Sequence, residues 1–433
     1  MKNTVEQFRS YPGSVRLLMV NQFTINLGFY MLMPYLATYL AGPLGLAGWL
    51  VGLILGVRNF SQQGMFLIGG TLGDRLGYKP MIIAGLVLRT AGFAALGLVE
   101  SVPALLAASA ATGLAGALFN PASRAYLAAD AGERRVEAFA LFNVFYQAGI
   151  LLGPLVGMIL TGVDFSVACL AAAAIFAILS IVQIRALPAR RADDVGSGEG
   201  DGEGILRQWR AMFSNRPFLL FSGAMIGSYV MSFQVYLSLP LEVRRLGGEG
   251  TFGTATMAIL FAVSGLSTIA FQTRVTAWCK ARMEPGGALT RGLLVMGAAF
   301  IPLLAASVVP VPDGGVGLWL LAGLPPALAA LLLAVGTMIA YPFEMDIIVR
   351  LADNRLLATH YGLYNTICGI GITVGNLLTG MSLDAARRAG LPALPWVALF
   401  LLGLACAAAL RTLHRTGRLS PDAAEGERPA VAA

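Results

Sequence analysis

Charged residues are scarce in this sequence. Asp, Glu, Lys and Arg make up only 12% of the 433 residues, whereas 57% are hydrophobic. A soluble domain of ordinary composition carries about 25% charged residues. Because the deficit extends along the whole chain, the composition predicts a multi-pass membrane protein. Catalytic signatures are also missing, since there is no Walker motif, no Ser/His/Asp arrangement and no metal-ligand cluster. We therefore expect no enzymatic activity, no cofactor and no bound metal.

Cysteine and histidine are equally sparse. The four cysteines show no CxxC spacing, and both histidines are expected near cytoplasmic ends of apolar runs: Cys169, Cys279, Cys368, Cys406, His360 and His414. These positions predict neither a disulfide framework nor a zinc site.

Long apolar runs, in contrast, are abundant. A spanning helix needs roughly 20 apolar residues, and twelve candidate spans can be drawn: 14–40, 47–72, 80–99, 103–127, 136–161, 166–187, 216–241, 252–276, 289–308, 318–349, 356–381 and 393–413. Prolines and glycines inside them do not exclude helices, because neighbouring helices can satisfy the freed backbone groups. The predicted fold class is an all-α integral membrane protein with twelve transmembrane helices.

A polar stretch divides the twelve runs into two groups of six. It contains a run of Gly, Ser and acidic residues, and from Ile205 a short sequence typical of an amphipathic interfacial helix. We expect an N-terminal six-helix half at 1–187, this cytoplasmic linker at 188–215, a C-terminal six-helix half at 216–413 and a cytoplasmic tail at 414–433.

The two halves are weakly similar to each other. Three residues of the fifth run have counterparts in the eleventh run, each 222 positions later: Asn143 with Asn365, Gly149 with Gly371, and Gly153 with Gly375. Repeats of this kind predict a substrate site near the middle of the membrane, in a central cavity between the halves.

Basic residues outnumber acidic ones, and a net charge of +7 could indicate a nucleic-acid-binding protein. Their distribution indicates a membrane orientation instead. With both termini in the cytoplasm, cytoplasmic segments hold 23 of the 30 Lys and Arg, and external loops hold four. This asymmetry follows the positive-inside rule. We therefore expect cytoplasmic termini and membrane lipids as partners, and no nucleic acid.

The connection between the second and third runs concentrates glycine and charge: Gly70, Asp74, Arg75, Gly77 and Lys79. This spacing resembles the loop 2–3 signature of the major facilitator superfamily, with Tyr78 in place of the family's second basic residue. The resemblance implies a cytoplasmic gate in which the acidic end of the fourth run, Asp130, is the partner of Arg75. A carboxylate at a helix end can pair with a cation or a helix N-terminus on the neighbouring half and so hold the cytoplasmic side closed. The alternative is ordinary loop charge beside the membrane.

The fifth run combines glycines at intervals that permit close helix packing with a proline that kinks the helix: Gly149, Gly153, Pro154 and Gly157. This pattern resembles the motif of drug/proton antiporters within the superfamily, although Met158 replaces its second terminal glycine. Gly375 and Asn376 in the eleventh run lack the proline. The resemblance implies export rather than import, and generic helix packing is the alternative.

Ionisable residues inside the runs are candidates for proton coupling. A mid-membrane arginine costs at least ~2.5–3.5 kcal/mol, which applies to Arg58 and Arg89. A structural network and a substrate or proton contact are equally open for Arg58, and a structural role is favoured for Arg89. In the tenth run Glu344 and Asp346 point about 200° apart on a helix, and Asp346 can pair with Arg350. We expect Glu344 to carry the proton, with Asp346 and Arg58 as further candidates.

Polar and aromatic residues recur within the runs and suit an adaptable amphipathic cavity, although some will only hold helices together. The expected cavity residues are Gln22, Asn26, Tyr30, Arg58, Gln62, Asn120, Asn143, Gln147, Gln234, Tyr236, Tyr341, Glu344, Tyr364 and Asn365.

Residues 56–97, which include both membrane arginines, carry a narrower resemblance. Their sequence is similar to the MdtH-type branch of bacterial multidrug exporters. A segment of the fourth run is also similar to that branch, but the branch has Asp where this chain has Asn120. This departure shifts the expected proton role towards Glu344.

The resemblance implies a proton-driven exporter of small amphipathic compounds, including antibiotics, in the bacterial cytoplasmic membrane. We expect it to be a monomer. Transport would proceed by alternating access as the halves rock. Two alternatives stay open: a proton-coupled importer of a small metabolite, and a non-transporting receptor on the same fold.

Overall fold

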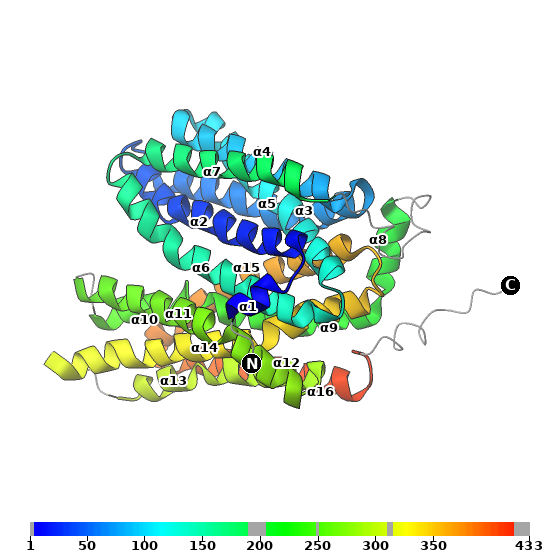
Figure 1. Cartoon of the computed structure of the whole chain (residues 1–433). Coiled ribbons are helices and arrows are strands. Elements are labelled where there is room, and N and C mark those ends of the chain that lie inside the picture. Colours follow the sequence, from blue (N-terminus) through cyan, green and yellow to red (C-terminus); the bar gives the residue numbers. More distant parts are fainter. Residues whose placement is uncertain (1–3, 189–204, 248–250, 310–314, 420–433) are drawn as a thin grey trace. The chain divides into compact units, whose positions relative to one another are not determined.

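The computed structural model describes residues 4–188, 205–247, 251–309 and 315–419. In this part of the chain the regular secondary structure is helical, with no strand (Figure 1). Most of the polar run in the expected linker, and the end of the expected tail, lie outside the described residues. The protein is therefore built from helices, as its long apolar runs predict.

The chain forms two compact units. Unit 1 comprises residues 1–214 and 352–366, and unit 2 comprises residues 215–351 and 367–433. Unit 1 contains α1 (Thr4–Arg9), α2 (Gly13–Ala41), α3 (Gly48–Leu76), α4 (Tyr78–Leu98), α5 (Val102–Ala131), the 3₁₀ helix η1 (Gly132–Arg134), α6 (Arg135–Thr161), α7 (Phe165–Ala186) and α8 (Ile205–Ser214). Unit 2 contains α9 (Arg216–Phe233), α10 (Ser238–Gly247), α11 (Thr251–Arg282), α12 (Pro285–Ala298), α13 (Ile301–Ser307), α14 (Gly315–Leu351) and α16 (Leu394–Arg415).

Helix α15 (Leu357–Ala389) is shared by the two units. Its first ten residues belong to unit 1, although they lie far beyond the linker in sequence, and the remainder belongs to unit 2. The start of the eleventh predicted span is therefore a structural element of unit 1.

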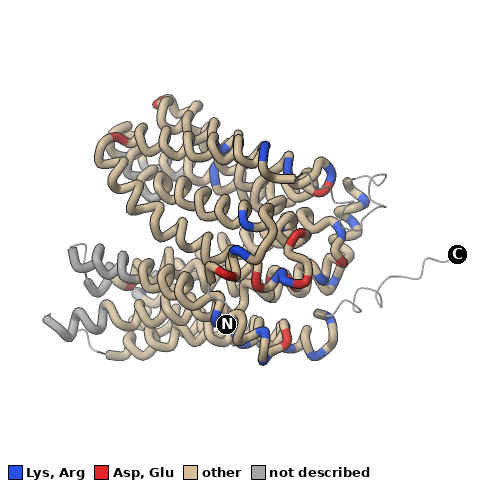
Figure 2. The backbone as a smooth tube through the Cα atoms, viewed as in Figure 1, with Lys and Arg blue, Asp and Glu red and all other residues tan. Residues whose placement is uncertain are grey.

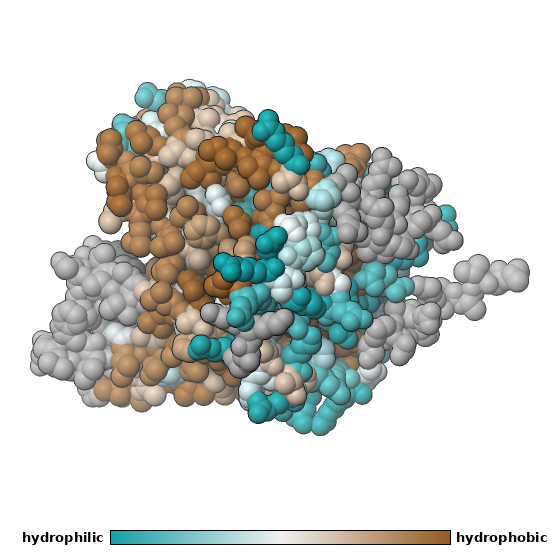
Figure 3. All heavy atoms as spheres, viewed as in Figure 1, coloured by the Kyte–Doolittle hydropathy of each residue, from teal (hydrophilic) through white to brown (hydrophobic). Residues whose placement is uncertain are grey.

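The helices have the length and composition of membrane spans. Among the described residues, eight stretches are long and apolar enough to cross a membrane, and one of these, 102–161, contains both α5 and α6. Helices α2, α3 and α11 correspond to the other predicted spans. Figure 3 shows hydrophobic side chains spread over the helices of unit 1, in the upper part of the view. The predicted all-α membrane fold with twelve spanning helices is confirmed.

Two predicted spans are interrupted. The seventh, expected at 216–241, consists of α9 and α10, with a turn between Phe233 and Ser238. The ninth, expected at 289–308, consists of α12 and α13, and Pro302 lies in the first turn of α13. Proline lacks an N–H and tolerates the first turn of a helix better than its interior. The break before Pro302 follows from this preference.

Helix ends in unit 1 are set by residues suited to tight turns. Gly77 joins α3 to α4 with a φ of 94°, and Gly132 follows α5 with a φ of 53°. Both values lie in the region that favours glycine. Asp164 caps α7 by accepting a hydrogen bond of 2.6 Å from the backbone N–H of Ser166.

The core of unit 1 is formed by α2 packing on α6 and α7, and by α5 packing on α3 and α4. Helices α2 and α7 run antiparallel, with Tyr39 stacked on Phe165 at 3.9 Å between ring centroids. Deeper in the bundle, Phe93 contacts Phe176 edge to face at 5.0 Å. In unit 2, α14 packs on α11 and α12, and α12 packs on α16. Charged residues gather mainly near helix ends (Figure 2).

Candidate functional site

Asp74, in the last turn of α3, is buried and accepts four hydrogen bonds. The backbone N–H groups of Ala358 and Thr359 donate to its carboxylate at 3.1 and 2.7 Å, and the Thr359 hydroxyl donates at 2.6 Å. The Tyr78 hydroxyl adds a bond of 3.1 Å. Ala358 and Thr359 form the first turn of α15, whose free N–H groups and positive dipole end favour an anion. The carboxylate therefore holds the start of α15 against α3.

Glycines allow the two helices to come this close. A Cβ at Gly70 would collide with the carbonyl oxygen of Ala358, and a Cβ at Gly362 would collide with that of Phe66. Two backbones can approach to this extent only where a side chain is missing. The missing side chain at Gly70 therefore lets α15 come close enough to α3 to form hydrogen bonds with Asp74.

The other motif residues contact other parts of unit 1. Arg75 lies 3.4 Å from the Gln208 side-chain oxygen on α8, and Lys79 donates to the Ile184 carbonyl at 2.8 Å in the last turn of α7. Asp130 accepts a hydrogen bond from the Ser14 hydroxyl. The pairing of Arg75 with Asp130 stays a prediction.

The amphipathic helix expected from Ile205 is present as α8. The Trp209 indole N–H donates to the Thr71 hydroxyl at 2.9 Å. Together with Gln208, it attaches the linker helix to the end of α3 that carries Asp74. These contacts, like Thr359, were not among the sequence predictions, because their partners lie far apart in the chain.

The glycines of α6 pack on α2. A Cβ at Gly149 or Gly157 would collide with the carbonyl oxygens of Phe23 and Met31, respectively. At Gly153 it would lie 2.7 Å from the Tyr30 Cβ and 3.0 Å from the Leu27 carbonyl oxygen. The Pro154 carbonyl accepts a bond of 2.7 Å from the Tyr35 hydroxyl. The glycines of this motif thus bring the backbones of α6 and α2 into contact within unit 1.

Several predicted cavity residues of unit 1 also take part in helix contacts. The Asn26 amide donates to the Tyr146 carbonyl at 3.0 Å. Arg124 donates to the Asn365 side chain at 2.8 Å, and the Asn365 amide donates to the Tyr361 carbonyl at 2.7 Å. The buried members of the set in this unit are Gln22, Asn26, Asn143, Tyr364 and Asn365, whereas Tyr30, Arg58, Gln62, Asn120 and Gln147 are partly exposed.

Two carboxylates are buried in α14 of unit 2. Glu344 is 3% exposed and accepts a hydrogen bond of 2.9 Å from the Tyr229 hydroxyl on α9. Asp346 is equally buried but forms an ion pair of 2.7 Å with Arg350. The i, i+4 pair expected from the sequence is present, and Glu344 faces a different helix.

The remaining candidates of unit 2 are Gln234, Tyr236 and Tyr341. Gln234 donates to the Val230 carbonyl at 2.8 Å, whereas Tyr236 is about half exposed and packs on Phe261 with ring centroids 5.5 Å apart. Tyr341 is partly buried, on the same helix as Glu344.

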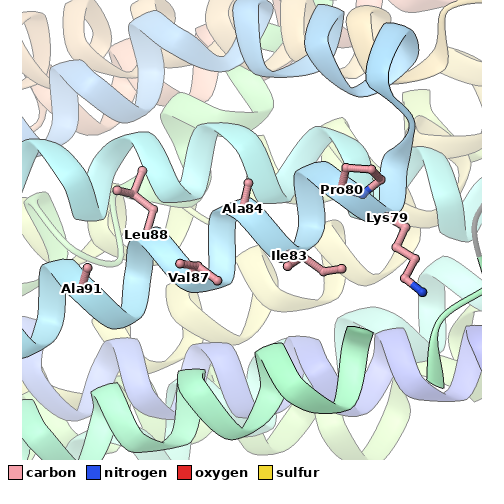
Figure 4. Close-up of a pocket in the computed structure, with 7 residues that line it drawn as sticks. All are labelled: Lys79, Pro80, Ile83, Ala84, Val87, Leu88 and Ala91. Carbon is pink, nitrogen blue, oxygen red and sulfur yellow. The ribbon is translucent and has the colours of Figure 1, made fainter. Parts of the chain in front are cut away.

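A groove of about 700 Å³ runs along the outer face of α4 (Figure 4). Its lining residues are Lys79, Pro80, Ile83, Ala84, Val87, Leu88 and Ala91. No predicted cavity residue lines it. Because its walls are apolar apart from Lys79, it has the character of a membrane-facing surface rather than of the transport path.

The sequence profile described as Major Facilitator Superfamily matches residues 18–376. The chain belongs to this superfamily. It is 52% identical to an MFS-type transporter of Mycobacterium tuberculosis (strain ATCC 25618 / H37Rv), over 94% of each chain. It is 30% identical to the multidrug resistance protein MdtH of Sodalis glossinidius, over 97% of this chain and 96% of that protein.

The MdtH protein of Salmonella arizonae is 28% identical over 89% of this chain and 90% of its own length. The crystal structure of the E. coli fucose:proton symporter superimposes with a TM-score of 0.69 over 95% of this chain and 99% of that one, at 15% identity. This similarity shows the fold. The chain is therefore a membrane transporter of the major facilitator superfamily and not an enzyme.

Proposed function

We propose that this transporter exports small amphipathic compounds across the bacterial cytoplasmic membrane in exchange for protons. The observation that carries the proposal is the buried carboxylate of Glu344, which accepts a hydrogen bond from Tyr229 within the spanning helices of unit 2. Ionisable side chains inside membrane spans mark proton relays and substrate paths. The direction of transport is supported by the MdtH relatives, which are named multidrug resistance proteins.

Glu344 is the proposed proton carrier. In its ionised form it accepts the Tyr229 hydroxyl proton in a hydrogen bond of 2.9 Å, and in its protonated form it becomes a donor itself. Asp346 is a weaker candidate because its carboxylate is already paired with Arg350. Proton binding at Glu344 would alternate with substrate binding, so that each event favours a different conformation.

Asp74 is the proposed gate. Opening at this end requires the three hydrogen bonds from the start of α15 to Asp74 to break, whereas the bond from Tyr78 at the start of α4 can persist. A hydrogen bond to a charged group is worth about 1.5–3 kcal/mol. The hydrogen bonds from α15 to Asp74 can therefore stabilise the conformation in which α15 contacts α3. Because they all meet at one carboxylate, they can form and break together during alternating access.

A drug-susceptibility panel tests the proposal. An efflux-deficient bacterial host expressing the chain should become several-fold more resistant to some amphipathic compounds, and a protonophore should remove the gain. If the chain instead takes up a compound along the proton gradient, it is a symporter and not an exporter. Unchanged susceptibility and accumulation across the panel, with the protein present in the membrane, would favour a receptor.

A further inference from the structure

Two arginines lie inside the helix bundle of unit 1, around one aromatic ring. The guanidinium carbons of Arg58 on α3 and Arg89 on α4 are 4.5 and 5.9 Å from the centroid of Phe29. Arg89 also lies 5.6 Å from the Phe176 ring and is only 6% exposed. Two positive charges therefore share one small region of the spanning helices.

The surrounding helices carry no carboxylate at this depth. Helices α2, α4 and α7 contain no Asp or Glu, and in α3, α5 and α6 the single acidic residue lies within three positions of a helix end: Asp74, Asp130 and Glu137. Cation–π contacts contribute about 0.5–2 kcal/mol, and they leave the charge in place. An uncompensated buried charge is strongly destabilising, so the buried Arg89, which shares the Phe29 ring with Arg58, favours a bound anion.

Hydrogen-bond donors of the pair are left without acceptors. Arg58 donates to the side-chain oxygens of Asn59 at 2.7 Å and Gln62 at 2.8 Å, both of them neutral. The Nε atoms of Arg58 and Arg89 are buried and have no hydrogen-bond partner in the described part of the chain. Buried donors of this kind normally bind an acceptor.

These donors converge beside a glycine of α5. Because its oxygen accepts from Arg58, Gln62 turns its amide nitrogen the other way. That nitrogen and a terminal nitrogen of Arg89 lie 3.2 and 3.4 Å from the point that a Cβ of Gly116 would occupy. The two nitrogens thus lie together beside α5, at a position where this helix carries no side chain.

We propose that Arg58, Gln62 and Arg89 bind the carboxylate of the transported compound. The planar fork of an arginine matches a carboxylate with two parallel hydrogen bonds. Phe29 and Tyr30, whose rings lie 5.2 Å apart, provide an aromatic surface for the apolar body. Asn59, which accepts a hydrogen bond from Arg58, is exposed. This inference rests on the proposed function and specifies its substrates as aromatic carboxylates.

Binding of 2-naphthoate and of 2-naphthamide to the purified protein tests the proposal. The two probes share the aromatic body, and only the first carries the anion. Calorimetry in chloride-free buffer at pH 7 should give at least tenfold tighter binding for the naphthoate. Equal affinities, or no binding of the naphthoate, would overturn the assignment.

Substitutions locate the anion. Arg89→Gln should remove the preference for the naphthoate. Arg58→Gln should reduce this preference, and it provides the test if Arg89→Gln does not fold. Arg185→Gln, an exposed arginine in the last turn of α7, is the matched control and should bind as the wild type does. A preference for the naphthoate that survives both site variants would place the anion elsewhere and refute the proposal.

Chloride separates a substrate site from a site for an inorganic anion. Under the proposal, 100 mM chloride should weaken naphthoate binding less than threefold. Tight chloride binding that displaces the naphthoate would assign the pair to a small inorganic anion instead. Since these measurements use no proton gradient, failure of proton-driven export in cells would refute the proposed function and leave this site intact. Export confined to compounds without an anionic group would refute the site alone.

Discussion

Helices α6 and α15 carry glycines at matching positions, but these glycines meet different atoms in the two units. In unit 1, Gly149 and Gly157 face carbonyl oxygens of α2. In unit 2, Gly371 and Gly375, the counterparts of Gly149 and Gly153, face the side chains of Ile226 and Val230 on α9. A backbone oxygen cannot move without bending its helix, whereas a side chain can be trimmed or turned. The same residue type thus has a different mechanical role in each unit.

The contact at Asp74 follows the pattern of unit 1, because two of its donors are backbone N–H groups of α15. The two buried carboxylates of α14 in unit 2 instead contact side chains, Tyr229 and Arg350. Contacts to backbone are specific in geometry and hard to repair, and contacts to side chains can be repaired by a second substitution. The predictions that follow test this difference.

The largest effect is expected for Gly153→Leu. The new side chain would enter a contact where even a Cβ lies 2.7 Å from Tyr30 and 3.0 Å from the Leu27 carbonyl oxygen, and overpacking costs ~1–3 kcal/mol or more. We expect loss of export with protein still present in the membrane, measured by drug accumulation and immunoblot. Gly223→Leu, at a glycine of α9 with open space around it, should export normally. Normal export by Gly153→Leu would show that α6 and α2 do not need this contact.

A smaller but clear effect is expected for Asp74→Asn. The amide keeps the size of the carboxylate but turns one acceptor into a donor that faces other donors, and it removes the charge at the start of α15. Export per molecule should fall about tenfold at normal abundance. Thr359→Val removes the 2.6 Å hydroxyl bond and leaves the backbone donors, so its loss should be smaller. Wild-type rates in Asp74→Asn would exclude the gate.

Alanine substitutions compare the two units directly. Gly157→Ala and Gly375→Ala both add one methyl group. At Gly157 it collides with the backbone carbonyl of Met31 as well as with the Tyr35 ring, whereas at Gly375 it meets only the Val230 side chain, with its Cβ 2.5 Å from a methyl carbon. We expect a lower melting temperature for each purified variant. The melting temperature of the double variant Gly375→Ala/Val230→Ala should lie within about 2 °C of that of the single variant Val230→Ala. Failure of that rescue would show that the two helix contacts are equally rigid.

The smallest effect is expected for Glu284→Gln. Glu284 precedes α12 and pairs with His414 at 3.2 Å, but its side chain is 80% exposed. Exposed ion pairs contribute about 0–1 kcal/mol. Export and melting temperature should match the wild type, and a large loss in either would mean that unit 2 has a charge contact comparable to that of Asp74.

Local patterns in the sequence predicted local structure well. The apolar runs predicted the spanning helices, and the spacing of Asp346 and Arg350 predicted their ion pair, because both depend on residues a few positions apart. The glycine spacing of α6 predicted a close helix contact but not its partner α2. The donors of Asp74 on α15 lie 284 and 285 residues away, so no pattern within one segment could identify them. The interruption between α9 and α10 was also missed, since hydropathy there is continuous.

Proton coupling through Glu344 is the central claim, and proton release from the purified protein tests it most directly. A compound selected in the susceptibility panel is added to detergent-purified protein in weak buffer, and the pH is followed. The wild type should release protons on substrate binding, and Asp346→Asn should release the same amount. Glu344→Gln should bind the compound and release none. Release by Glu344→Gln equal to that of the wild type would contradict the account and place the coupling group elsewhere.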